Sequence, residues 1–151
     1  NFGMRQVITL NLSIDENCDI ISKESTPQSV TYNILDQSTS TDAPFDFQYE
    51  GDVTGKVSQY DAAILTICGC EKYSITDIVL NVKAGKSSSK AQYSIEFNDK
   101  KYSNIISKYS TTAYTPLALL DAPIPLGTDS ITITFYSQSG AWYLESLTLT
   151  Y

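Results

Sequence analysis

Hydrophobic and polar residues alternate along most of the chain, the pattern of strands that bury one face. Near the C-terminus, apolar residues take every second position over 130–136. A polar turn at Ser137–Gly140 follows, and Trp142–Tyr151 is a second run rich in β-forming residues. This stretch predicts two antiparallel strands joined by the turn.

The second of these runs changes phase part-way along. Trp142 and Leu144 share one face, but Leu147 and Leu149 fall on the opposite parity. A strand that keeps its apolar side inward across such a jump needs one extra residue. We therefore expect a β-bulge near Glu145–Ser146.

Similar patterns recur upstream between turn-forming segments. They predict strands at 5–14, 29–35, 45–50, 62–70, 75–84, 91–98 and 101–106, with shorter ones at 18–21 and 115–120. Residues 62–70 are apolar on both parities, which indicates a strand covered on both faces. Asn98–Asp99 predicts a tight hairpin turn. Nine or ten strands and no helical period predict an all-β fold, an antiparallel β-sandwich of two sheets.

Length and charge narrow the classes of protein. A chain of 151 residues suits one domain over 1–151, and no apolar run reaches the roughly 18–20 residues of a membrane span. The net charge of −7 argues against nucleic acid as a partner. The chain begins at Asn1 without a leader, so we expect either a mature secreted form or an excised piece. We also expect the protein to be a monomer.

The three cysteines, Cys18, Cys68 and Cys70, are too few for a disulfide-stapled scaffold. Cys68 and Cys70 are two apart on a predicted strand and should share a face, where a bridge between them would be strained. A bridge from Cys18 to either one stays open as an alternative. Buried free thiols are the leading interpretation.

The second half of the chain has a familiar order of features. An apolar strand leads into residues 75–84, a Lys/Ser/Gly loop and the 91–98 strand, and a proline-containing segment precedes the closing pair at 130–151. This order resembles the jelly-roll, galactose-binding-like β-sandwiches, many of them carbohydrate-binding modules, of secreted and surface-anchored bacterial proteins. The resemblance covers roughly residues 60–151. It implies a secreted or cell-surface binding module.

Some modules of this kind hold a structural calcium with an acidic residue of the last strand, and Glu145 stands at the comparable place. The alternative is an edge glutamate that the bulge turns to solvent. A second acidic group, Asp42, Asp46, Glu50 and Asp52, has no EF-hand spacing and is interpreted as a solvated face.

Sugar recognition combines a flat aromatic surface with a few placed polar groups. Trp142 follows the turn at a sheet end, Tyr109 and Tyr114 lie in a polar loop, and Tyr60 and Asp61 precede a strand. These five residues are the candidate ligand site. The alternative is that Trp142 caps the core and the tyrosines are half-buried.

The chain has no histidine, which removes every Ser–His and Cys–His arrangement. No nucleophile elbow, P-loop or dinucleotide fingerprint is present. We therefore expect no catalytic residues and no enzyme; a hydrolase would need two carboxylates across a cleft. The leading hypothesis is a non-catalytic glycan-binding module. The alternative is a structural or protein-interaction domain of a larger surface protein, such as an adhesin.

Overall fold

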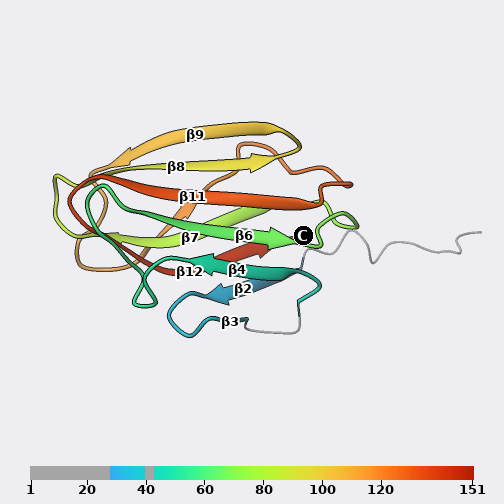
Figure 1. The fold of residues 1–151 in the computed structure, drawn as a ribbon, viewed down its shortest axis with the longest axis horizontal. Helices are drawn as coiled ribbons and strands as arrows, with labels where there is room; N and C mark the ends of the chain where they lie inside the picture. The colour runs from blue at the N-terminus through green and yellow to red at the C-terminus, as the bar shows by residue number, and fades with distance from the viewer. Residues whose placement is uncertain (1–27, 40–42) are drawn as a thin grey trace, which may run out of the picture.

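The computed structural model describes residues 28–39 and 43–151, which form two antiparallel sheets with no helix among them (Figure 1). The five-stranded sheet has the order β4 (Asp46–Glu50), β6 (Ala62–Cys68), β11 (Ser130–Ser139), β8 (Lys90–Phe97) and β9 (Lys100–Ser107). The six-stranded sheet has the order β10 (Thr115–Ala118), β7 (Asp77–Ala84), β12 (Trp142–Thr150), β2 (Ser29–Asn33) and β3 (Ser38–Thr39), with β5 (Lys56–Val57) also paired to β12. The predicted β-sandwich class is confirmed.

The predicted strands at 5–14 and 18–21, and Cys18 and Asp42, lie outside the described residues. The other predicted strands are all present. The described residues also contain two short strands in segments that the sequence predicts as loops, β3 and β5. These two-residue strands carry no alternation long enough to recognise. With them, the described part of the chain holds eleven strands.

The closing pair of strands is central to the fold, but it is not a hairpin. β11 lies between β6 and β8 in one sheet, and β12 lies between β7 and β2 in the other. The short link between Ser139 and Trp142 therefore carries the chain from one sheet to the other. Alternation predicts each strand well, but it cannot tell a hairpin turn from such a crossing.

The apolar positions of both strands fill the space between the sheets. Ile131, Ile133 and Phe135 of β11 are fully buried, as are Leu144 and Leu149 of β12. Pairing between β12 and β7 shifts register between Leu144 and Ser146, which confirms the bulge predicted near Glu145. The bulge keeps both halves of β12 facing the core.

The prediction that residues 62–70 form a strand covered on both faces is wrong. One face of β6 is buried and the other is only half-buried. Cys68 and Cys70 do not share a face either. The strand ends at Cys68, Gly69 has φ of +82°, and this turn directs Cys70 into the core while Cys68 stays partly exposed.

Both described cysteines are free thiols, but of the two only Cys70 is buried, so the interpretation as buried free thiols holds for Cys70 and not for Cys68. Burial is the main cause that raises the pKa of Cys70, to about 11. Its Sγ lies 3.8 Å from the Ile67 carbonyl oxygen. A neutral thiol in such surroundings behaves as a small apolar side chain.

Trp142 belongs to the core. None of its surface is exposed, its ring meets Phe135 edge-on with centroids 5.6 Å apart, and its indole N–H donates to the Lys90 carbonyl oxygen at 3.1 Å. Tyr109 covers it from outside, with ring centroids 6.0 Å apart. Trp142 therefore joins the two sheets at the end where the chain crosses between them.

We predict that Trp142→Ala lowers the free energy of unfolding by about 3–5 kcal/mol, because it empties a fully buried site at the junction of the sheets. Urea denaturation measures the change. Tyr60→Ala is the matched control, since Tyr60 is 68% exposed and its loss should change stability by no more than about 0.5 kcal/mol. Equal effects of the two substitutions would contradict the structural role of Trp142.

We predict that iodoacetamide modifies Cys68 much faster than Cys70 in the native protein at pH 8. A thiol with a pKa of about 11 is about 0.1% thiolate at that pH, and Cys70 is also enclosed. Reaction at Cys70 should rise steeply as the pH approaches 11. Peptide mapping by mass spectrometry separates the sites, and concentrated urea, which should equalise their rates, is the control.

Candidate functional site: a groove beneath the β8–β9 hairpin

A cavity of the described structure opens between the β8–β9 hairpin and the segment that follows β10. Its volume is about 290 Å³. β9 is the outermost strand of its sheet and β10 the outermost of the other. Seven of the eight residues of β9 are exposed, including three of the four whose side chains point toward the opposite sheet. The groove is therefore the uncovered edge of the space between the sheets.

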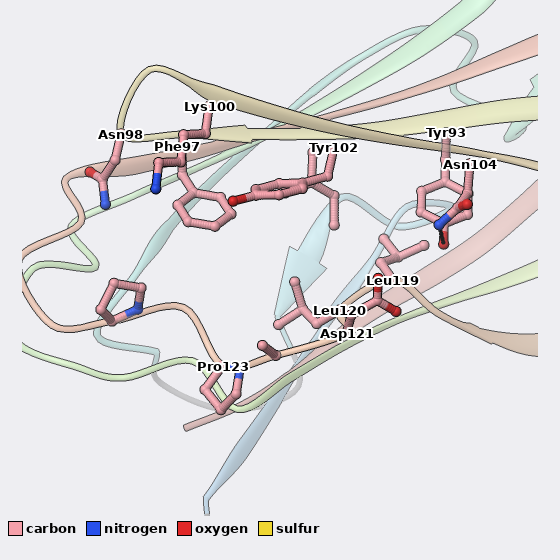
Figure 2. Close-up of a pocket in the computed structure, with 13 residues that line it drawn as sticks. Tyr93, Phe97, Asn98, Lys100, Tyr102, Asn104, Leu119, Leu120, Asp121 and Pro123 are labelled. Atoms are coloured by element: carbon pink, nitrogen blue, oxygen red, sulfur yellow. Dashed lines mark hydrogen bonds between the residues drawn. The ribbon is translucent and has the colours of Figure 1, made fainter.

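Two aromatic rings hang from the hairpin into this groove (Figure 2). Phe97 ends β8, and Tyr102 lies on β9 on the same side of the sheet. Their ring centroids are 5.7 Å apart with the planes inclined by 31°, so they form a nearly continuous aromatic surface. Tyr102 is 54% exposed. An aromatic surface of this size left open to solvent is suited to contact with a ligand.

The hairpin holds these rings in a fixed position. Eight residue pairs join β8 and β9, from Lys90 opposite Ser107 to Phe97 opposite Lys100. The connecting residues Asn98 and Asp99 have φ of +52° and +61°, the left-handed pair of a type I′ turn. The tight turn that the sequence predicts at Asn98–Asp99 is confirmed.

The opposite wall is a segment of leucine, alanine and proline with one aspartate, and it runs along the edge of β7. Backbone hydrogen bonds of 3.1 and 2.8 Å link Ile75 and Ile124 in both directions, and the Leu119 N–H donates to the Ile78 carbonyl oxygen at 2.8 Å. Ile124 is fully buried and anchors the segment. With Ile124 held in the core, the residues around it in the sequence line the groove: Leu119, Leu120, Asp121, Ala122, Pro123 and Pro125.

Polar groups stand at the two ends of the aromatic pair (Figure 2). At one end, the Asn98 amide donates to Thr128 Oγ1 at 3.1 Å, and Lys100 lies beside it. At the other end, the Asn104 amide donates to the Tyr93 hydroxyl at 3.2 Å, and Asp121 lies nearby. These bonds orient both amides and leave hydrogen-bonding capacity free on each. No ion pair joins groove-lining residues, all of which are described.

None of the five predicted ligand residues lines this groove. Trp142 cannot stack on a sugar because its ring is enclosed by the core, so that assignment is wrong and the alternative, a core cap, holds. Tyr109 is half-buried against Trp142, and its hydroxyl donates to the Pro116 carbonyl oxygen at 2.9 Å. Burial raises the pKa of Tyr109.

Tyr60 and Asp61 are both exposed, in the loop before β6. The Tyr60 N–H donates to the Ser137 carbonyl oxygen, which places this loop at the end of the sandwich near the β11–β12 link. A shallow polar depression lies there, lined by Lys56, Ser58, Gln59, Gly85, Lys86, Gly140, Ala141 and Tyr143. Neither Tyr60 nor Asp61 lines it.

Tyr114 and Glu145 come together on the six-stranded sheet. Lys83 Nζ lies 4.9 Å from the ring centroid of Tyr114 and 5.4 Å from that of Tyr143. Burial, and then the charge of Glu145, raise the pKa of Tyr114. Among the described residues, no three Cys, Asp or Glu side chains gather in a group fit for a metal ion. A structural calcium at Glu145 stays a prediction.

The sequence carries a signal for the groove that the prediction does not use. The inward positions of β9 are Lys100, Tyr102, Asn104 and Ile106, and two of these four are strongly polar. A strand whose inner face is covered by the opposite sheet would be apolar there. This pattern indicates an edge strand whose inner face stays open, although the wall opposite it comes from residues 15–25 positions downstream.

No protein-family model matches the chain, and no curated protein matches it. Solved structures of similar fold include a family two carbohydrate esterase from Cellvibrio japonicus, with a TM-score of 0.47 and 12% identity over 83% of this chain and 34% of that one. The chain therefore spans about a third of the length of the esterase.

Two further similar structures are carbohydrate-binding modules. TmCBM61 in complex with β-1,4-galactotriose has a TM-score of 0.45 and 8% identity over 70% of this chain and 87% of that one. The C-terminal CBM6 of LamC from Zobellia galactanivorans has a TM-score of 0.44 and 12% identity over 83% of this chain and all of that one. At these values the likeness concerns the β-sandwich and says nothing of a ligand. The two-sheet antiparallel sandwich of this chain rests on its own strand pairing.

Proposed function

We propose that this chain is a non-catalytic binding module that holds a carbohydrate in the groove beneath the β8–β9 hairpin. The observation that carries the proposal is the open aromatic surface of Phe97 and Tyr102 with polar groups at both of its ends. A pyranose has apolar C–H faces that stack on aromatic rings and hydroxyls that amides and carboxylates bind. The groove offers both kinds of contact.

The rigidity of the site supports binding. The rings stand on a hairpin joined by eight residue pairs, and the facing segment is fixed to β7. The amides of Asn98 and Asn104 are oriented by hydrogen bonds of 3.1 and 3.2 Å. A preformed site loses little conformational entropy when ligand enters, so even a small contact area gives measurable affinity.

The composition of the groove supports binding without catalysis. Asp121 is the one carboxylate among the residues that line it, whereas glycoside hydrolysis uses two about 5–10 Å apart. The chain also has no histidine to act as a general base. We infer that the module works as a monomer in a secreted or cell-surface protein, where it would hold that protein on a glycan. No helix of the described residues is long and apolar enough to cross a membrane.

A second candidate function is docking of another protein along β9. Within the described structure β9 pairs only with β8, so its other edge is open. Ile105 is 61% exposed on the face opposite the groove. Open strand edges can accept an added strand from a partner. In this second candidate, the partner protein contacts the face of β9 that carries Ile105, opposite the face that carries Tyr102.

We predict that Tyr102→Ala weakens oligosaccharide binding by about tenfold or more, because the loss of the ring removes roughly 1.4 kcal/mol or more of stacking and apolar contact. Isothermal titration calorimetry with a panel of neutral oligosaccharides measures it. Ile105→Ala is the matched control, since Ile105 lies on the same strand with similar exposure but faces away from the groove.

The two candidates give opposite results with this pair of variants. Carbohydrate binding requires that Tyr102→Ala loses affinity and Ile105→Ala keeps it. If no oligosaccharide binds the unsubstituted chain, or if both variants bind as it does, the groove is not a sugar site. Docking along β9 would instead make Ile105 the sensitive position in a protein-binding assay.

A further inference from the structure

We propose that Thr128, which does not itself line the groove, is a positioning residue for ligand binding: its hydroxyl links the two walls and fixes the amide of Asn98. This inference rests on the proposed function and adds a residue outside the lining to the same site. It is carried by two hydrogen bonds of one buried hydroxyl and by the donor and acceptor roles that they impose.

The hydroxyl of Thr128 connects the β8–β9 hairpin with the facing segment. It donates to the Pro125 carbonyl oxygen at 2.9 Å and accepts from the Asn98 amide at 3.1 Å. Asn98 lines the groove from the hairpin and Pro125 lines it from the other wall, whereas Thr128 is fully buried. In the described part of the chain, no other side-chain hydrogen bond joins residues 90–107 to residues 119–128. One hydroxyl therefore couples the two walls at this end of the groove.

Chemistry fixes which group donates and which accepts in each of these two bonds. A carbonyl oxygen only accepts, so the single proton of the Thr128 hydroxyl is committed to Pro125. Toward Asn98 the hydroxyl then acts only as an acceptor, and Asn98 has to present an amide N–H to it. A flipped amide would set its oxygen against the lone pairs of the hydroxyl. The bond therefore holds Asn98 Nδ2 toward Thr128 and leaves Oδ1 and the second N–H for other partners.

Thr128 is itself held on both sides by backbone hydrogen bonds. The Gly127 N–H donates to the Glu71 carbonyl oxygen at 2.8 Å, and the Asp129 carbonyl oxygen accepts from the Gly69 N–H at 3.1 Å. β11 begins at the residue that follows. The hydroxyl therefore has a fixed position in the body of the sandwich, and it ties the exposed turn of the hairpin to that position.

Asn98 is the residue through which this fixed point acts on a ligand. It follows Phe97 directly in the sequence, so its amide stands beside the first ring of the aromatic surface (Figure 2). A polar group binds best when its orientation is set before the ligand enters, because little rotamer freedom is then lost. Without the Thr128 hydroxyl the amide would be free to rotate in the open turn. Affinity would fall although every lining side chain is still present.

Thr128→Val tests the inference, because it keeps the shape of the side chain and removes the hydroxyl. We expect it to weaken binding of the tightest-binding neutral oligosaccharide of the panel by about five- to tenfold in isothermal titration calorimetry, the loss of about one hydrogen bond. Thr128→Ser restores the hydroxyl and should bind as the unsubstituted chain does. Thr128→Ala, which also lacks the hydroxyl, replaces the valine variant if that variant does not fold.

A double-mutant cycle separates positioning from a general loss of stability. Asn98→Gly removes the amide but keeps the left-handed turn, since glycine accepts the positive φ of this position. If Thr128 acts through Asn98, Thr128→Val has no further effect on affinity in the Asn98→Gly background. An equal loss of affinity in both backgrounds would overturn the inference, as would unchanged binding by Thr128→Val alone.

A measurement without ligand distinguishes failure of this inference from failure of the proposed function. We expect the side-chain amide protons of Asn98 to exchange with water faster in Thr128→Val than in the unsubstituted chain, as measured by NMR. Asn104 is the internal control, because its amide bonds to Tyr93 instead. If no oligosaccharide binds but Asn98 loses protection, the proposed function is overturned and the positioning of Asn98 stands. If the exchange of Asn98 is unchanged, the inference is overturned whether or not a sugar binds.

Discussion

The structure depends on the passage of the chain from the centre of one sheet to the centre of the other between β11 and β12. Each strand has a neighbour on both sides, so the pair holds together most of the strands in the two sheets. Trp142 stands at the crossing, packed on Phe135 of the opposite layer and bonded through its indole N–H to the Lys90 carbonyl of β8. One aromatic side chain thereby ties β11, β12 and β8 into a single core.

The position of the β8–β9 hairpin depends on that core. β8 pairs with β11 along most of its length, and β9 pairs only with β8. β9 is the outermost strand of its sheet, and its inward side chains Lys100, Tyr102 and Asn104 line the groove beside the segment after β10 and remain exposed. The groove follows from this edge position, and the same pairing that stabilises the core makes the groove rigid.

Local patterns in the sequence predict nearly all of the described strands and the bulge in β12. They succeed because alternation and phase are properties of adjacent residues. The burial of Trp142 also follows from a local pattern, because Trp142 shares parity with the apolar Leu144, and both are fully buried. The position of Trp142 directly after a turn favours exposure, whereas its parity with Leu144 favours burial. Parity predicts the burial correctly because a strand that begins at a sheet end still turns one face to the core.

The groove could not be predicted in the same way. One wall is the β8–β9 hairpin and the other is the segment from Leu119 to Pro125, and their meeting depends on how the two sheets overlap. The polar residues at inward positions of β9 indicate only that no strand of the opposite sheet covers its inner face. What stands opposite is decided by the pairing of Ile75 with Ile124, which holds the downstream segment against β7.

Exposure of Tyr102 is the feature that a purely structural sandwich would not need. An edge strand avoids aggregation with charged side chains, and Lys100 and Lys101 already supply them at the start of β9. A serine or threonine in place of Tyr102 would keep the alternation and leave less apolar surface in water. A large ring held open beside Phe97, with oriented amides at either end, is instead the arrangement that a flat apolar ligand with a polar rim requires.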